Sequence, residues 1–113
     1  MFNYKEVWLS SGNANGLLSE SIIVEGKVTS SIKIDPFGRI MDYRQYGNHN
    51  HNHGWEVDHI VPVSSAGTDD PSNLQPLNWY SNRLKGDKSM DEALKEHYKN
   101  KTYADAIRHY RPS

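Results

Sequence analysis

Four residues of this sequence have the types and order needed to hydrolyse a phosphodiester around one metal ion: Asp58, His59, Asn73 and Asn82. Hydrolysis of a phosphodiester needs a deprotonated water and neutralisation of the phosphate charge. His59 suits proton abstraction, because histidine is the side chain that ordinarily changes charge near neutral pH. Asp58 and Asn82 offer a carboxylate and an amide oxygen, which are hard ligands that suit Mg²⁺. The four residues therefore predict a metal-dependent hydrolytic site.

The segments around these residues support the prediction. They read Trp-Glu-Val-Asp-His-Ile-Val-Pro at 55–62, Asn-Leu-Gln-Pro-Leu at 73–77 and Asn-Arg-Leu-Lys-Gly-Asp-Lys at 82–88. In this order they resemble the HNH nuclease family, whose fold is the ββα-metal unit, also called the His-Me finger. The resemblance covers residues 54–88, about a third of the chain. It implies a metal-dependent endonuclease.

The resemblance also implies a role for each residue. His59 and Asn73 form the catalytic set, in which His59 is the general base and Asn73 fixes the loop and orients the imidazole. Asp58 and Asn82 hold the metal ion. The family often has His at the third motif position, so Asn82 is a departure that shifts the expected metal toward Mg²⁺. Mn²⁺ is the expected substitute, and Zn²⁺ or Ni²⁺ is less favoured.

Net charge argues for modest affinity for nucleic acid. The chain has 13 Lys and Arg against 14 Asp and Glu, so it lacks the positive field of a tight, nonspecific DNA binder. A local basic groove is still predicted, because basic residues flank the motif on both sides. The candidates for nucleic-acid contacts are Arg39, Arg44, Arg83, Lys85 and Lys88. The competing interpretation is that each is a solvated surface charge.

The elements that must position these residues form a single α+β domain over residues 1–113. The sequence predicts a ββα-metal core at 54–88, preceded by an N-terminal β-hairpin and followed by C-terminal helices at 89–111. Residues 21–25 and 27–34 are expected to be β. The second segment has Val28, Ile32 and Ile34 on its buried face, and a turn at 35–38 and a strand at 39–42 complete a hairpin. Residues 1–20 are expected to form a loop or a mobile arm.

Inside the core, the sequence predicts strands at 55–60 and 77–79, a loop at 62–76 and a helix at 80–85. Asp58 and His59 would face opposite sides of a regular strand, so they meet in one site only if the strand twists or ends there. After the core, Ser89 to Glu92 form a capping box that opens a helix. The expected packing residues are Trp55, Trp79, Tyr80, Leu74, Leu77 and Leu84.

Three histidines, His49, His51 and His53, alternate with asparagines just before the core. In an extended chain their imidazoles would point the same way, as metal ligands do. The flanking Gly47 and Gly54 and the lack of apolar residues favour a solvated loop instead.

The chain has no cysteine, so neither disulfides nor zinc knuckles brace the fold. No long apolar run predicts a membrane span or a signal peptide, so a cytoplasmic protein of bacterial or phage origin is expected. The predicted function is hydrolysis of DNA by a metal-dependent HNH endonuclease. The alternatives are an RNase or toxin nuclease with the same site, and a catalytically silent nucleic-acid-binding module. DNA is the expected partner, RNA is the alternative, and a protein partner or a homodimer stays open.

Overall fold

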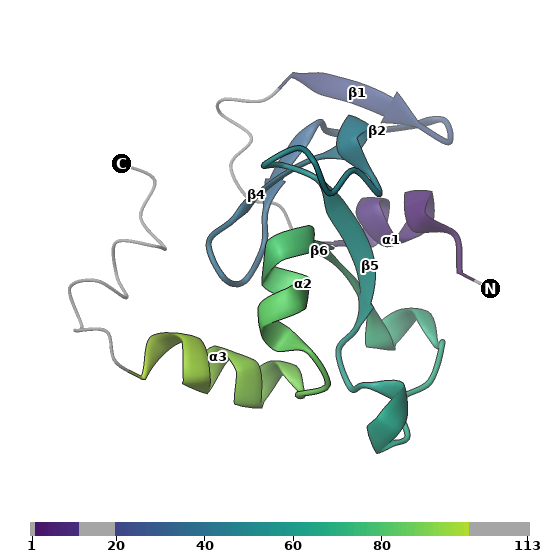
Figure 1. Ribbon diagram of the computed structural model, residues 1–113. Helices are drawn as coiled ribbons and strands as arrows, with labels where there is room; N and C mark the ends of the chain where they lie inside the picture. The colour runs from purple at the N-terminus through teal and green to yellow at the C-terminus, as the bar shows by residue number, and fades with distance from the viewer. Residues whose placement is uncertain (1, 12–19, 100–113) are drawn as a thin grey trace.

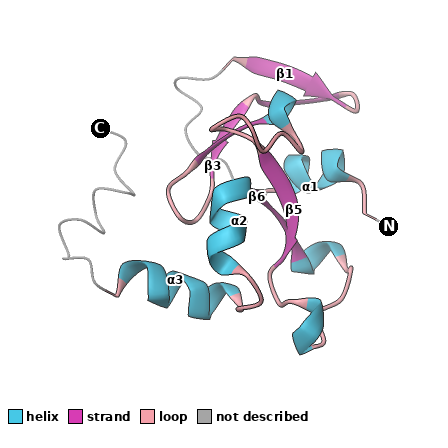
Figure 2. Cartoon of the chain, in the orientation of Figure 1, coloured by secondary structure: helices cyan, strands magenta, loops and turns pink. Residues whose placement is uncertain are grey.

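The computed structural model describes residues 2–11 and 20–99, and its fold is mixed α+β (Figures 1 and 2). Helix α1 precedes two short antiparallel hairpins, β1–β2 and β3–β4, and a longer antiparallel ribbon, β5–β6. Helices α2 and α3 follow the ribbon. The bounds are α1 Tyr4–Ser10, β1 Ser21–Val24, β2 Lys27–Ser30, β3 Ile32–Ile34, β4 Ile40–Asp42, β5 Trp55–His59, β6 Leu74–Asn78, α2 Trp79–Lys85 and α3 Met90–Tyr98.

The β5–β6 ribbon is the centre of the described fold, and α1 and α2 both contact it. Its register pairs Trp55 with Asn78 at one end and His59 with Leu74 at the other. Trp55 packs against Trp8 of α1, while the intervening Glu56 contacts Asn82 of α2. Because side chains alternate along a strand, β5 presents one face to each helix.

Two apolar clusters hold these elements together. The first joins Trp8, Met41 and Trp55, each at most 2% exposed. The second joins Phe37, Leu77, Met90 and Ala93, and so connects the β3–β4 turn, β6 and α3. Full burial of one large apolar side chain contributes about 1.5–3 kcal/mol, so these clusters anchor α1 and α3 against the ribbon.

The prediction of a mobile arm is wrong for the part of residues 1–20 that forms α1. Asn3 caps this helix by accepting a hydrogen bond from the Lys5 backbone N–H, at 2.9 Å. Trp8 is fully buried, and its indole N–H donates to the Ser30 carbonyl at 3.1 Å. Burial of this aromatic side chain explains why the segment is ordered. Residues 12–19 lie outside the described part of the chain.

The β segment expected at 21–25 is confirmed as β1, which pairs with β2, so the region contains two hairpins instead of the one expected. The strand predicted over 27–34 is interrupted at Ser31. The predicted buried face is wrong, since the side chain of Val28 is 73% exposed whereas that of Lys33, on the other face, is 3% exposed. Lys33 is buried because its ammonium donates to the Trp8 and Ser11 carbonyls near the end of α1, at 2.5 and 3.1 Å. The turn predicted at 35–38 is confirmed by a hydrogen bond from the Gly38 N–H to the Asp35 carbonyl.

The predicted elements of the core are present, with shifted boundaries. β6 begins at Leu74, three residues before the predicted start, and α2 begins at Trp79. The cap of α3 is confirmed, since Ser89 Oγ accepts from the Glu92 N–H at 3.2 Å. Trp55 and Leu77 are buried as expected, but Tyr80 and Leu84 are exposed. The later helix predicted within 89–111 lies outside the described residues, and no described helix is long and apolar enough to cross a membrane.

Candidate active site

The carboxylate of Asp58 lies on the α2 face of β5 and is buried there. One oxygen lies 3.3 Å from the Lys85 ammonium, and the other accepts from the Gln75 side-chain amide at 3.1 Å. Burial raises the pKa of Asp58, and the Gln75 hydrogen bond and the Lys85 charge oppose that rise. Asp58 is therefore charge-balanced within the protein by a lysine.

Lys85 is almost fully buried, at 1% exposure. Its ammonium also donates to the His59 carbonyl at 2.8 Å, so it ties the end of α2 to the end of β5. The prediction that Lys85 contacts nucleic acid conflicts with this position, because a buried ammonium with two protein partners has no access to a phosphate. From the sequence, Lys85 is one of several basic residues in a short segment. Only the geometry of α2 shows that its side chain points into the protein.

Asn82, the other predicted metal ligand, contacts Glu56 on the same face of β5. Its side-chain nitrogen donates to one Glu56 oxygen at 2.6 Å, and the second Glu56 oxygen contacts His49 Nε2. No hydrogen bond or ion pair among the described residues joins Asp58 to Asn82. The Asn82 side-chain nitrogen donates to Glu56, so the amide oxygen of Asn82 is the atom that would serve as an acceptor or metal ligand.

His59 is the last residue of β5, and its imidazole pairs with a carboxylate from the following loop. Nε2 lies 2.7 Å from an Asp69 oxygen. The imidazole is 23% exposed and the Asp69 side chain 66% exposed, so the pair lies at the surface. Phe2 packs edge-on against the His59 ring, with 6.3 Å between centroids. His59 and Asp58 therefore have different partners, as expected for neighbours in a regular strand.

Asn73 joins the two ends of the loop between β5 and β6. Its side-chain oxygen accepts from the Val61 N–H at 2.8 Å, and its nitrogen donates to the Val61 and Thr68 carbonyls at 3.0 and 2.8 Å. Gly67 completes the closed loop, because a Cβ at this position would lie 1.7 Å from the Val61 carbonyl oxygen. The closed loop brings Asp69, the residue after Thr68, to His59.

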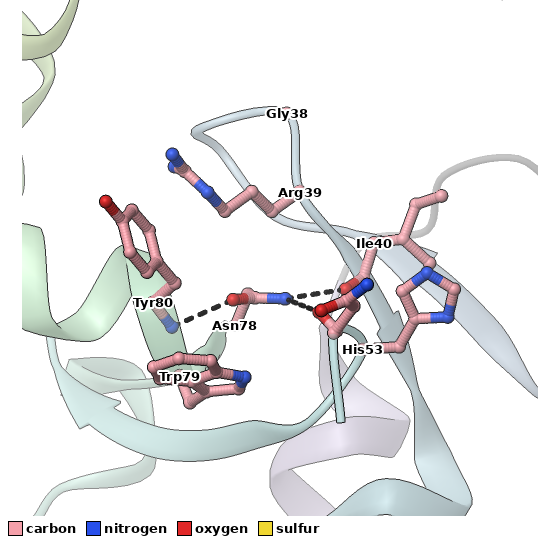
Figure 3. Close-up of a pocket in the computed structure, with 8 residues that line it drawn as sticks. Gly38, Arg39, Ile40, His53, Asn78, Trp79 and Tyr80 are labelled. Carbon is pink, nitrogen blue, oxygen red and sulfur yellow. Dashed lines mark hydrogen bonds between the residues drawn. The ribbon is translucent and has the colours of Figure 1, made fainter. Parts of the chain in front are cut away.

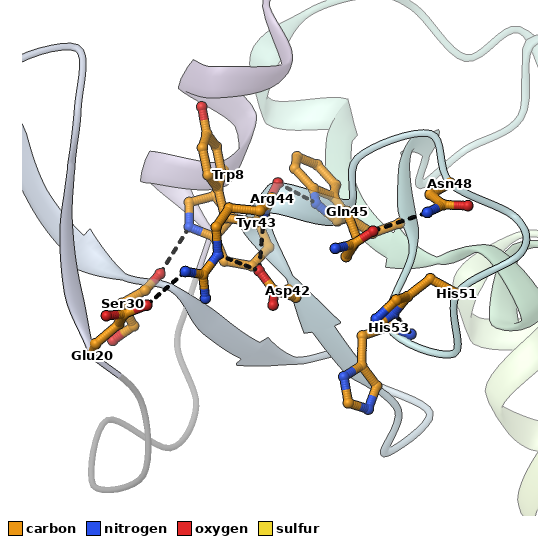
Figure 4. Close-up of polar contacts among 11 residues, drawn as sticks. Trp8, Glu20, Ser30, Asp42, Tyr43, Arg44, Gln45, Asn48, His51 and His53 are labelled. Carbon is orange, nitrogen blue, oxygen red and sulfur yellow. Dashed lines mark hydrogen bonds and ion pairs between the residues drawn. The ribbon is translucent and has the colours of Figure 1, made fainter.

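The other predicted nucleic-acid residues differ in availability. Arg83 and Lys88 are exposed, and the Arg83 guanidinium lies over the Trp79 ring at 4.8 Å. Arg39 lies over the Tyr80 ring at 4.8 Å. Arg44 is exposed but pairs with two acidic side chains, Glu20 at 2.7 Å and Asp42 at 3.2 Å (Figure 4). These carboxylates offset the positive charge of Arg44.

The three alternating histidines lie in turns and do not share one direction. His51 and His53 contact each other edge to face, with 5.4 Å between ring centroids. His49 instead pairs with Glu56 and stacks on Trp79 at 6.0 Å. Gly54 permits the tight return of this loop, because a Cβ there would lie 1.8 Å from the Asn48 carbonyl oxygen.

Oxygen donors lie on the α2 face of β5 and on α2 itself, where Asn82 contacts Glu56 while Asp58 contacts Lys85 and Gln75. The carboxylates of Glu56 and Asp58 and the amide of Asn82 are hard ligands of the kind Mg²⁺ takes. The described residues contain no cluster of three or more His, Cys, Asp and Glu side chains with metal-site spacing. The Lys85 ammonium, 3.3 Å from an Asp58 oxygen, would compete with a metal ion at Asp58.

Besides Lys85, which was expected to contact nucleic acid, sequence reasoning missed three partners of the candidate residues. Glu56 could have been found, because it lies two residues before Asp58 and so on the same strand face. Gln75 is the cross-strand partner of Asp58, which required the β5–β6 register. Asp69 could not be distinguished from Asp70 in the loop sequence, and only the folded loop shows which carboxylate reaches His59.

Comparison with protein families assigns the segment that contains these residues. Residues 47–88 match the HNH endonuclease family. The match confirms the family resemblance of the sequence and suggests a nuclease-type function for this part of the chain. HNH nucleases act on nucleic acids and generally use a divalent metal ion. No match was found among the curated proteins or among the solved structures.

Proposed function

We propose that this protein is a metal-dependent HNH endonuclease that hydrolyses DNA, with β5, β6 and α2 as its ββα-metal core. The observation that carries the proposal is the position of His59 within the matched segment. Its imidazole lies at the end of a strand, is partly accessible, and pairs with Asp69 at 2.7 Å. A surface imidazole held by a carboxylate is suited to proton abstraction.

In this proposal, Asp69 determines which nitrogen of the His59 imidazole carries the proton. A carboxylate accepts a hydrogen bond, so its contact with Nε2 favours the tautomer that carries the proton on Nε2. Nδ1 is then the proton acceptor. When Nδ1 takes a proton from water, the negative Asp69 lies next to the positive imidazolium and stabilises it. The water oxygen forms a bond to phosphorus while the bond to the leaving deoxyribose oxygen breaks, and that oxygen takes a proton from solvent.

Asn73 contributes to the same step through the loop. Its three hydrogen bonds to Val61 and Thr68 fix the backbone that carries Asp69. Replacement of Asn73 would therefore disturb the position of Asp69 and, through it, the orientation of His59. This is a positioning role, because no atom of Asn73 needs to contact the substrate.

Asp58 and Asn82 would hold the divalent metal ion, with Glu56 as an additional oxygen donor on the same strand face. Held by these residues, a Mg²⁺ or Mn²⁺ ion would supply positive charge to offset that of the phosphate and the leaving oxygen. Glu56 accepts a hydrogen bond from the Asn82 nitrogen and thereby turns the Asn82 oxygen away from itself. Binding at Asp58 competes with the Lys85 ion pair, so we expect affinity for Mg²⁺ to be modest.

A catalytically silent nucleic-acid-binding module is the second candidate, and one observation favours it. Asp58 is already charge-balanced by Lys85 and hydrogen-bonded to Gln75, as expected for a structural carboxylate. Such a module would bind DNA without cleaving it, and its binding would not depend on divalent metal. Cleavage assays distinguish the two candidates directly.

Nicking of supercoiled plasmid, with Mg²⁺ and with EDTA, tests the proposed function. We expect cleavage that EDTA abolishes, and a loss of about 10²–10⁴-fold in His59→Ala, because proton abstraction is removed. DNA binding by His59→Ala should stay near that of the parent. The matched control is His51→Ala, which removes an imidazole that lies outside the proposed catalytic set and should keep parental cleavage. Equal nicking by His59→Ala and the parent after independent purifications would refute the assignment and favour the binding module.

A further inference from the structure

A cavity of about 350 Å³, open to solvent, lies at the Trp55–Asn78 end of the β5–β6 ribbon, opposite the end that carries His59 (Figure 3). Three segments form its walls: the turn before β4, the His-rich loop, and the start of α2. The lining residues are Gly38, Arg39, Ile40, Asn52, His53, Asn78, Trp79 and Tyr80. Its volume falls in the range of small-ligand sites, which is roughly 300–1,000 Å³.

The cavity is preformed, because one buried side chain fastens its three walls. Asn78 is 2% exposed. Its nitrogen donates to the carbonyls of Ile40 and Asn52, both at 2.9 Å, and its oxygen accepts from the Tyr80 N–H at 2.9 Å (Figure 3). A ligand would therefore bind without the cost of ordering these segments.

The lining favours a flat, electron-rich ligand with a nearby negative charge. The Arg39 guanidinium and the Tyr80 ring stack on each other at 4.8 Å, and Tyr80 is 47% exposed. None of the lining residues is acidic. Planar guanidinium and phenol groups stack on nucleobases, and the positive charge of Arg39 attracts a phosphate.

A chain of side-chain contacts connects the cavity to the candidate metal ligands. Trp79 forms part of the wall and stacks on His49, which pairs with Glu56, and Glu56 accepts from Asn82. Arg83, one turn after Trp79, lies over the same indole, 4.8 Å from the ring centroid. A strand whose base occupies the cavity would thus have its neighbouring phosphates near α2.

We propose that this cavity binds an unpaired nucleobase of the substrate strand, stacked against Arg39 and Tyr80. The proposal rests on the proposed function, since it names how the same enzyme holds its substrate. Base stacking would give the chain a source of affinity for DNA other than long-range charge attraction. That attraction is weak, because the net charge of the chain is −1. Stacking of one base contributes about 1–3 kcal/mol and so offsets that deficit.

Fluorescence titration of the full chain with an eight-nucleotide single-stranded DNA tests the proposal. The titration is done in EDTA, so that cleavage plays no part. Trp8 and Trp55 are fully buried, whereas Trp79 is partly exposed in the cavity wall, so a stacked base should quench mainly Trp79. We expect saturable quenching, which Trp79→Phe removes. The matched duplex should bind more weakly, because its bases are stacked on each other.

Tyr80→Ala and Arg39→Gln should each weaken binding of the oligonucleotide by roughly 5–150-fold, the factor that corresponds to loss of one stacked base. Lys27→Gln is the matched charge control, because Lys27 is an exposed lysine on β2, and it should bind as the parent does. Circular dichroism shows whether each variant is folded, and fluorescence anisotropy of a labelled oligonucleotide gives an independent affinity.

Two results would overturn the proposal. The first is parental affinity in both folded variants, Tyr80→Ala and Arg39→Gln. The second is equal affinity for the single strand and the duplex together with unchanged Trp79 emission, which would indicate binding to the phosphate backbone alone. In either case His59-dependent nicking by the parent would leave the proposed function intact. Absence of both nicking and oligonucleotide binding would refute the two proposals together.

Discussion

The two faces of β5 use charged side chains in different ways. On the α2 face, Asp58 is buried and pairs with the buried Lys85. At the end of the α1 face, His59 and Asp69 form a shorter contact, 2.7 Å against 3.3 Å, but both side chains are accessible to solvent. The buried pair is enclosed by β6 and α2, whereas the accessible pair depends on the loop that Asn73 closes.

Because of this difference, we expect the buried pair to affect mainly the stability of the fold and the accessible pair to affect mainly catalysis. A buried charge without its partner is costly, so the Asp58–Lys85 pair constrains the fold strongly. An exposed pair contributes little to stability, because water solvates both groups when they separate. His59 and Asp69 can therefore serve proton transfer at small cost to the fold, and substitutions in the two pairs should affect different measurements.

Lys85→Met should produce the largest change in stability. It leaves the Asp58 carboxylate buried without a cation, and loss of one partner of a buried pair lowers the free energy of unfolding by about 3–5 kcal/mol. Urea denaturation at neutral pH measures the change. Lys88→Met is the matched control, because Lys88 is exposed and lies in the same segment, and it should stay within about 0.5 kcal/mol of the parent.

Addition of Asp58→Asn to Lys85→Met sharpens this comparison. The double variant buries no unpaired charge, so it should recover part of the lost stability. The raised pKa of Asp58 also predicts that Lys85→Met is less unstable in acid, since protonation removes the buried charge. A Lys85→Met protein as stable as the parent would show that the pair does not constrain the fold.

Asp69→Asn should act on catalysis and leave stability unchanged. If Asp69 holds the reactive tautomer of His59, kcat should fall roughly tenfold or more, with KM near the parental value, because this interaction strengthens in the transition state. Asp69→Glu should restore part of kcat. The ¹⁵N spectrum of the His59 ring should show a smaller share of the Nε2-protonated tautomer in Asp69→Asn.

Asp70→Asn is the matched control for Asp69→Asn. It makes the same change in charge at the next residue, and asparagine replaces aspartate well as the cap of the turn at Pro71–Asn73. We expect parental kcat and stability. Equal losses of kcat in the two variants would indicate a general effect of loop charge and would contradict a specific role for Asp69.

His49→Ala should have a smaller effect, on metal affinity. His49 holds Glu56, and Glu56 orients the Asn82 amide, so loss of this support should weaken Mn²⁺ binding by about 10-fold. Electron paramagnetic resonance of Mn²⁺ measures the affinity without any need for cleavage. His51→Ala is the control and should bind Mn²⁺ like the parent. Equal affinities of the two variants would show that His49 does not support the metal site.

The comparison also shows what could be predicted from the sequence. The β5 strand and the short helix that carries Asn82 followed from local patterns and from the family motif, because both signals are local. The partners of Asp58, His59 and Asn82 did not, since Lys85, Asp69 and Glu56 are brought near them by strand register and loop closure. The segment at 27–34 was misjudged because the apolar alternation gave no sign that Lys33 caps the end of α1.

Lys33 gives the smallest predicted effect, on the pH dependence of stability. Burial lowers the pKa of Lys33 from 10.5 to about 8. Between these values the folded protein has released a proton that the unfolded chain still binds, so stability should rise with pH across this window. We expect a contribution of about 1 kcal/mol, less than the full pKa shift implies at about 1.4 kcal/mol per unit, because Trp8 and Ser11 oxygens accept hydrogen bonds from the charged form. The measurement is urea denaturation of the parent and of Lys33→Met at pH 7.5 and 10.5. The stability of the parent relative to Lys33→Met should increase at the higher pH, and a constant or falling difference would show that Lys33 stays charged in the folded protein.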